Sequence, residues 1–201
     1  MSGVTAAAVQ DLRQRTGAGM MDCKKALMET QGDLEKAIEF LRKKGISSAD
    51  KKAGRETKQG AVVSYIHGGG RIGVLLEVNC ETDFVARNEN FQGFCQDVAM
   101  QVAATNPQFL DRESVPTSVL DKEKEILGEQ LKSQKKPENV IEKIVQGKLE
   151  KFFEENCLLE QSFVKDPDLS IRDYTKEAIS KLGENINIAR FARFELGQMD
   201  K

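Results

Sequence analysis

Residues 61–78 read AVVSYIHGGGRIGVLLEV, and this stretch decides the fold class of the chain. Two runs rich in β-branched residues, Ala61–Ile66 and Ile72–Val78, flank three consecutive glycines, which is typical of a β-hairpin with a flexible turn. Four apolar residues of the second run lie at every second position and share one face: Ile72, Val74, Leu76 and Val78. We therefore expect a β-hairpin with one apolar face.

Helical patterns and a last strand follow this hairpin. The sequence predicts a long amphipathic helix around Phe91–Val102, followed by two helices rich in charged residues between residues 118 and 155, with a break near Pro137. A turn is expected at Asp166-Pro167-Asp168. A helix over Ile171–Leu182, ended by Gly183, and a last strand over Ile186–Leu196 complete the pattern. Imperfect alternation in the last strand indicates a β-bulge. Helices combined with a small, mostly antiparallel sheet predict an α+β core.

The N-terminal part has the apolar period of short helices. We expect one helix through Val4, Ala8 and Leu12 that stops at Gly17-Ala18-Gly19, a second through Met20, Cys23 and Leu27 that ends at Gly32, and a third through Leu34, Ala37, Ile38 and Leu41 that Asp33 caps and Gly45 ends. Three such helices form a compact bundle, which is marginally stable alone but suited to present one surface to a partner.

A shift of charge marks the predicted domain boundary. The first 60 residues carry 12 Lys and Arg against 8 Asp and Glu, whereas the rest of the chain carries 18 against 24. The basic stretch Arg42–Lys58 is poor in large apolar residues and is either a solvated linker or a patch that steers a partner or nucleic acid. We predict a three-helix domain with a basic linker over residues 1–55 and an α+β core over residues 56–201.

The composition argues against several classes of protein. A net charge of −2 is untypical of a dedicated nucleic-acid binder, so no direct nucleic-acid partner is expected. No segment approaches the ~20 apolar residues of a membrane helix, and no signal-peptide pattern is visible, so we expect a cytoplasmic protein that does not enter a membrane. Four cysteines without a CxxC pair and one histidine provide little material for a zinc site, and no metal or cofactor is expected.

The chain has no recognisable catalytic motif. The patterns GxxxxGK(S/T), GxGxxG, HExxH and GxSxG are all absent from the sequence. His67-Gly68-Gly69-Gly70 superficially resembles the oxyanion loop of an esterase, but the chain lacks a nucleophile elbow and the glycines suit a hairpin turn better. The sequence therefore favours a partner-binding protein over an enzyme.

Two apolar features are candidates for partner binding. Phe84 follows the second strand of the hairpin inside a polar stretch, beside Asp83, and Asn88 is placed to cap the next helix. Spacing alone leaves two alternatives for Phe84: a core residue under the hairpin, or an exposed anchor beside an acid. Met20 and Met21 are adjacent and cannot both face the bundle interior, so one of them is expected to be exposed.

Two long motifs resemble the signatures of the bacterial elongation factor Ts family. Residues 12–27, LRQRTGAGMMDCKKAL, resemble its opening signature, and residues 77–88, EVNCETDFVARN, resemble its second. Residues 181–186, KLGENI, and 193–197, RFELG, resemble its third and closing blocks. The resemblance runs from Val4 to Gly197, and two long motifs in the right order are far more specific than one short pattern.

The resemblance implies a nucleotide exchange factor for the GTPase elongation factor Tu, with a ubiquitin-associated-like N-terminal bundle and no cofactor of its own. The family likeness assigns disturbance of the partner's magnesium site to Thr82, Asp83, Phe84 and Val85. It assigns the grip of the N-terminal domain on the partner to Arg13, Met20 and Met21. Weaker contact candidates are His67, Leu182 and Gly183.

This chain departs from the longer family members, which carry two core subdomains and a coiled-coil insertion. A short chain with one hairpin core would replace the two subdomains by pairing two copies, so a homodimer is predicted. A competing hypothesis from another class is a static adaptor, whose helical module and basic stretch tether a partner or ribosomal RNA without affecting any nucleotide. An adaptor of RNA would lose affinity steeply with salt.

Overall fold

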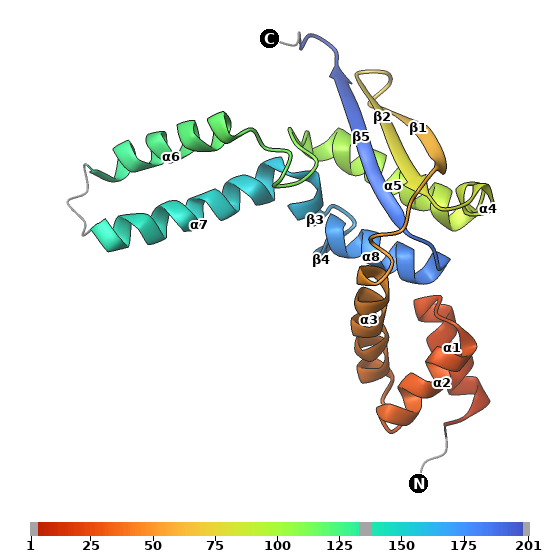
Figure 1. Ribbon diagram of the computed structural model, residues 1–201. Coiled ribbons are helices and arrows are strands. Elements are labelled where there is room, and N and C mark those ends of the chain that lie inside the picture. The colour runs from red at the N-terminus through yellow and green to blue at the C-terminus, as the bar shows by residue number, and fades with distance from the viewer. Residues whose placement is uncertain (1–3, 133–137, 199–201) are drawn as a thin grey trace. The chain divides into compact units, whose positions relative to one another are not determined.

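The computed structural model describes residues 4–132 and 138–198, which form helices around small antiparallel sheets (Figure 1). The elements in chain order are α1 (Ala6–Thr16), α2 (Met20–Glu29), α3 (Leu34–Asp50), β1 (Gln59–His67), β2 (Ile72–Cys80), α4 (Asp83–Ala86), α5 (Glu89–Thr105), α6 (Thr117–Lys132), α7 (Glu138–Asn156), the 3-10 helix η1 (Leu158–Glu160), β3 (Ser162–Phe163), β4 (Asp166–Ser170), α8 (Ile171–Leu182) and β5 (Ile186–Glu195). This arrangement confirms the α+β class.

The main sheet has the strand order β1-β2-β5. The amide of Arg71 donates to the carbonyl of His67 across the hairpin turn, and the amide of Leu196 donates to the carbonyl of Arg71 beside β5. Val74, Leu76 and Val78 of β2 are buried, so the predicted apolar face of the hairpin is confirmed. Alternation of side chains along a strand turns the residues between them to the opposite face.

The exposure of side chains changes phase along the last strand, and the β-bulge expected there stays a prediction. Ile186 and Ile188 are buried, whereas the less exposed residues of the second half are Phe191, Arg193 and Glu195. A shift of one residue in the alternation is the effect that a β-bulge has on a strand. In the second half, Arg193 Nε donates to the carbonyl of Ala103 in α5, at 3.2 Å.

Two local expectations are wrong. Gly45 does not end the third helix, because α3 continues to Asp50 and takes up half of the predicted basic linker. A Cβ at Gly45 would lie 3.0 Å from Ser180 Oγ, so this glycine permits a close approach of α3 to α8. Residues 166–168 are not a turn, because they belong to strand β4, which pairs antiparallel with β3. Pro167 lacks an N–H group, which an edge strand tolerates.

The two charge-laced helices are confirmed as α6 and α7, which pack against each other (Figure 1). The break that the sequence predicts at Pro137 lies outside the described residues. None of the helices in the described ranges is long and apolar enough to cross a membrane.

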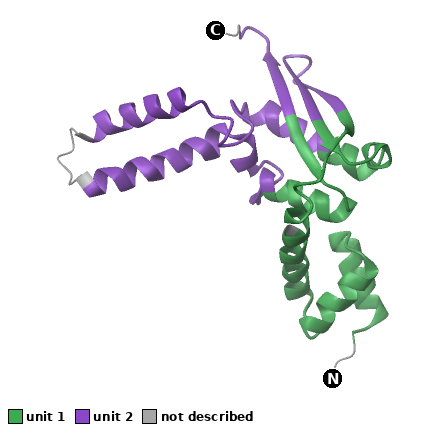
Figure 2. Cartoon of the chain, in the orientation of Figure 1, with its two compact units in different colours: residues 1–61, 78–94, 173–189 green, residues 62–77, 95–172, 190–201 purple. Residues whose placement is uncertain are grey.

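The chain divides into two compact units, one made of residues 1–61, 78–94 and 173–189, the other of residues 62–77, 95–172 and 190–201 (Figure 2). In the first unit, α1, α2 and α3 enclose a small core of their own, consistent with a ubiquitin-associated-like bundle. Its buried residues are Val9, Leu12, Cys23, Ala26, Leu27, Ala37 and Leu41. The separation into domains 1–55 and 56–201 stays a prediction.

Candidate functional site

Phe84 stands on α4, a single helical turn between β2 and α5. Thr82 is the N-cap of this turn, and its Oγ1 accepts a hydrogen bond from the amide of Val85 at 3.4 Å. The side chain of Phe84 is 82% exposed, whereas Phe91, seven residues later, is fully buried. Of the two alternatives that the spacing left open, the core position is therefore wrong and the exposed position is confirmed.

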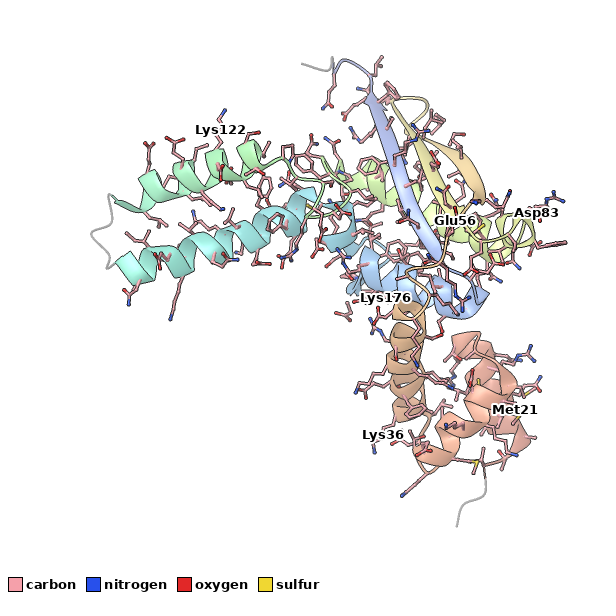
Figure 3. The ribbon with its side chains drawn as sticks, in the orientation of Figure 1. Met21, Lys36, Glu56, Asp83, Lys122 and Lys176 are labelled. Carbon is pink, nitrogen blue, oxygen red and sulfur yellow. The ribbon has the colours of Figure 1, made fainter. Side chains whose placement is uncertain are left out.

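Polar groups separate this turn from α5. Asp83, labelled in Figure 3, forms an ion pair with Arg87 at 3.0 Å, in which Arg87 is exposed and Asp83 is about half exposed. The Oδ1 of Asn88 accepts a hydrogen bond from the amide of Asn90 at 2.8 Å, as expected of a residue that caps α5. Phe84 therefore lies outside the apolar stripe of α5.

A carboxylate from a distant part of the sequence holds the segment before Phe84. Oε2 of Glu184 accepts hydrogen bonds from the amides of Glu81 at 3.1 Å and of Thr82 at 3.0 Å. Oε1 of the same residue accepts one from the hydroxyl of Thr82 at 2.6 Å. Three donors on one carboxylate form a tight attachment, because hydrogen bonds to a charged acceptor are stronger than neutral ones.

A reciprocal contact completes this attachment. Oε1 of Glu81 accepts a hydrogen bond from the amide of Asn185 at 2.6 Å. The buried side chain of Asn185 donates in turn to the carbonyl of Arg55 at 2.8 Å. The segments Glu81–Thr82 and Glu184–Asn185 thus hold each other, and we call these four residues the clasp.

The thiol of Cys80 is buried directly beneath the clasp. It donates to the carbonyl of Thr82 at 3.1 Å. Burial raises the pKa of Cys80, and the nearby charge of Glu184 raises it further. The thiol is therefore neutral at pH 7 and acts as a small packing group rather than as a nucleophile.

The N-terminal candidates surround the turn between α1 and α2. Gly17 ends α1 in the left-handed conformation with φ of 67°, and Met20 begins α2. Both Met20 and Met21 are exposed, at 46% and 74%, so the expected exposure of at least one is confirmed, whereas the place of Met20 on the inner apolar stripe of this helix is wrong. Cys23, Ala26 and Leu27 fill the inner face of α2 instead. Figure 3 labels Met21 on this bundle, and Arg13 is also exposed.

Two of the weaker candidates directly precede the clasp in the chain, and the third belongs to the other compact unit. Leu182 ends α8, and Gly183 follows it with a φ of 80°, immediately before Glu184. His67 belongs to the other compact unit, at the end of β1. Its Nδ1 lies 3.1 Å from the hydroxyl of Tyr65, and the two rings stack at 5.9 Å between centroids.

Within residues 4–132 and 138–198, no group of three or more His, Cys, Asp or Glu side chains is arranged to hold a metal ion. What the first unit presents is an exposed aromatic side chain on a short turn that buried and charged groups hold in place. Such a feature is typical of a contact with another macromolecule.

The comparison with known families decides between the remaining classes. The sequence model of the family described as Elongation factor TS matches residues 46–198. The chain belongs to the elongation factor Ts family. It is 60% identical over 195 residues to elongation factor Ts of Carboxydothermus hydrogenoformans, covering 97% of this chain and 90% of that protein.

Two further members of the elongation factor Ts family are equally similar. The protein of Geobacter sulfurreducens is 59% identical, over 97% of this chain and 90% of its own length. The protein of Caldanaerobacter subterraneus subsp. tengcongensis is 60% identical, over 97% of this chain and 98% of its own length. The chain is accordingly a translation elongation factor, with a role in protein biosynthesis.

The sequence motifs of elongation factor Ts located most of the site but missed its support. The residues assigned by likeness included Thr82 and Phe84 but neither Glu184 nor Asn185, which lie in the third block of the resemblance. The available signal was an acid and an amide directly after the glycine that ends α8. Their partner, Glu81, is about a hundred residues away, and a single sequence does not indicate such a pairing.

Proposed function

We propose that this member of the elongation factor Ts family is a guanine nucleotide exchange factor for elongation factor Tu. It binds the GTPase, and the segment Thr82, Asp83, Phe84 and Val85 disturbs the magnesium site of the partner and promotes release of GDP. The observation that carries this proposal is the 82% exposure of Phe84 on a turn whose N-cap is held by the clasp. Family membership supports the choice of partner.

Linkage explains how such a contact releases a nucleotide. An exchange factor binds the empty GTPase more tightly than the loaded one, and it therefore weakens nucleotide binding by the same factor. Magnesium bridges the phosphates to the GTPase, so displacement of its ligands removes much of the affinity for GDP. Burial of one phenyl ring contributes about 1.5–3 kcal/mol, equivalent to about 10- to 150-fold in this equilibrium.

Other contacts supply the rest of the affinity. We assign the N-terminal grip to Arg13, Met20 and Met21, and two exposed methionines beside one turn support this assignment, because methionine adapts to the shape of a partner. We assign weaker contacts to His67, Leu182 and Gly183. The exposure of Gly183 directly before the clasp supports its place near Phe84.

The proposed activity needs no chemistry on this chain. Exchange makes and breaks no covalent bond, so the protein is not an enzyme in that sense and needs no cofactor. The proposed partner is a protein, and direct contact with nucleic acid is not part of the role. We propose that the protein acts in the cytoplasm, where translation takes place.

We further propose that two copies of the chain form a homodimer through the open face of the β1-β2-β5 sheet. Five apolar side chains in the second unit are exposed there: Val62, Ile66, Leu75, Phe194 and Leu196. In β1 and β2 they alternate with the buried Val63, Val74 and Leu76, so they lie on the opposite face. A contiguous apolar face of this kind supports association.

Release of a fluorescent GDP analogue from elongation factor Tu tests the exchange function. Substoichiometric wild-type protein is expected to speed release and to turn over. Phe84→Ala should lower the acceleration by about 10- to 150-fold, because the buried ring area is lost. Ile126→Ala, which shortens an exposed apolar residue of α6, should leave the rate unchanged.

Two results would contradict this function. If release stays at its intrinsic rate while the two proteins co-elute, the chain is a static adaptor. If Phe84→Ala leaves acceleration intact, the mechanism assigned to Phe84 is wrong even though the exchange activity stands.

A further inference from the structure

One side chain from a distant part of the sequence accepts three hydrogen bonds from the residues that precede Phe84. The amides of Glu81 and Thr82 and the hydroxyl of Thr82 all donate to Glu184, which is 102 or 103 residues away along the chain. Buried or half-buried amides need a partner, because an unsatisfied donor is costly. Glu184 satisfies all three donors with its two carboxylate oxygens.

The hydroxyl of Thr82 transmits this attachment to α4. A hydroxyl has one proton to donate and two lone pairs that accept. The proton of Thr82 is directed to Oε1 of Glu184, so its lone pairs face away and accept the amide of Val85. Glu184 therefore orients the N-cap of the turn through the hydroxyl of Thr82.

A helix of four residues has little stability of its own, because forming the first turn fixes several dihedral angles for one hydrogen bond. The direction of the exposed Phe84 ring therefore depends on what holds the ends of α4. At its C-terminal end, Gln92 Nε2 donates to the carbonyl of Ala86 at 2.6 Å. At its N-terminal end the external support comes from Glu184.

We propose that Glu184 is a positioning residue for nucleotide exchange, which orders the Thr82–Phe84 turn before the partner arrives. This proposal rests on the exchange function proposed above. A preordered turn avoids the entropic cost of fixing the Phe84 ring at the moment of insertion. Glu184 acts through Thr82 and is not itself inserted into the partner.

A double-mutant cycle between Glu184→Ala and Phe84→Ala tests the proposal, with the maximal rate of GDP release as the readout. In the wild-type background, Glu184→Ala should lower the acceleration at least about tenfold, because three hydrogen bonds to a charged acceptor are lost. In the Phe84→Ala background, the same change should have an effect of about twofold or less, because no ring remains to be positioned.

A merely structural role for Glu184 gives a different pattern. If the substitution acted through general loss of stability, its effect would be the same in both backgrounds and the cycle would be additive. An additive cycle, or an unchanged rate with Glu184→Ala, would overturn the proposal. Glu142→Ala, at an exposed acid of α7, is the matched control and should be silent in both backgrounds.

Two more conservative variants test the same proposal if the Glu184→Ala protein does not fold. Glu184→Gln retains one oxygen for the two backbone amides but replaces the acceptor of the Thr82 hydroxyl by an NH2 group, so its exchange rate should lie between those of the wild type and Glu184→Ala. Thr82→Val removes only the hydroxyl that links the carboxylate to the turn, and it should behave as Glu184→Ala in the cycle with Phe84→Ala. Equal rates for Thr82→Val and wild type would overturn the proposal.

The outcomes separate this proposal from the exchange function. If wild-type protein fails to accelerate release, the exchange function itself is wrong. If wild type accelerates, Phe84→Ala is impaired and Glu184→Ala is not, the exchange function stands and only the positioning role of Glu184 is overturned.

Discussion

Phe84 is an aromatic residue that the fold leaves in solvent. Phe91, Phe94 and Phe163 are buried and contribute to the stability of the chain, but a side chain that is 82% exposed contributes little burial. The Phe84 side chain can instead gain this free energy of burial when a partner covers it. This difference in environment, rather than the residue type, separates the exposed Phe84 from the buried phenylalanines.

Glu160, in the 3-10 helix that follows α7, shows how the environment changes the pKa of a carboxyl group. Glu160 accepts hydrogen bonds from Arg172 at 2.6 Å and from Arg112 at 2.9 Å, and Arg112 also lies over the ring of Phe153 at 4.8 Å. Burial alone raises the pKa of Glu160, but the hydrogen bonds from Arg172 and Arg112 outweigh burial and hold this pKa below its ordinary value of 4.5. The group is ionised throughout the neutral range.

This depressed pKa predicts a dependence of stability on pH. A carboxyl group whose pKa is lower in the folded state contributes stability above its unfolded pKa, and this contribution is lost as the pH falls through the folded pKa. Urea unfolding at pH 7 and below pH 4 should therefore show a larger loss of unfolding free energy for the wild type than for Glu160→Gln. Equal losses would contradict the assignment of this pKa.

At the scale of elements, glycine marks the points where backbones come close. Gly60 lies at the start of β1, and a Cβ there would lie 2.2 Å from the carbonyl oxygen of Val78 in β2. The same residue has a φ of 150°, which L side chains rarely adopt. Gly54, a few residues earlier, has open space around the position of a Cβ.

These two glycines form a matched pair for a stability measurement. Gly60→Ala should lower the free energy of unfolding by about 2 kcal/mol or more, because the backbone of β1 or β2 has to move. Gly54→Ala should change it by less than about 1 kcal/mol, since nothing obstructs the methyl group. Chemical denaturation of both variants checks this. Similar values for the two would show that β1 and β2 do not approach as closely as described.

At the scale of the whole molecule, the most exposed apolar area of the second unit is the open face of the β1-β2-β5 sheet. The free edges and faces of a small sheet are normally covered or charged in a protein that stays monomeric. Arg190 and Glu77 form an ion pair across this part of the sheet, at 2.7 Å, and Val62, Leu75 and Phe194 are exposed apolar residues of the same three strands. The proposed homodimer would cover that face.

Light scattering at several protein concentrations tests the dimer. The wild type is expected to have twice the mass of one chain, and Leu75→Glu should raise the dissociation constant at least about tenfold, because a charge would enter the apolar interface. Val140→Glu, at an exposed position of α7, is the control and should leave the mass unchanged. A monomeric wild type would overturn the proposed dimer.

Local patterns in the sequence predicted the elements well. The β-hairpin, the helix that ends at Leu182, and the cap at Asn88 each follow from residues that are neighbours in the chain. The end of the third helix was predicted wrongly at Gly45. This glycine lies inside α3 and allows the helix to pack closely against Ser180. A glycine looks the same in a sequence whether it ends a helix or permits its packing.

By itself, the sequence determined the α+β class, most of the helices, the β-hairpin and the segment that carries Phe84, because periodicity, capping and turn signals are local and the family motifs are contiguous. Only the tertiary structure decided that Phe84 is exposed and that Glu184 holds Thr82. Exposure depends on which residues compete for the core, and Phe91 occupies it here. The clasp joins residues about a hundred positions apart, and only the folded chain brings their hydrogen-bonding groups within reach.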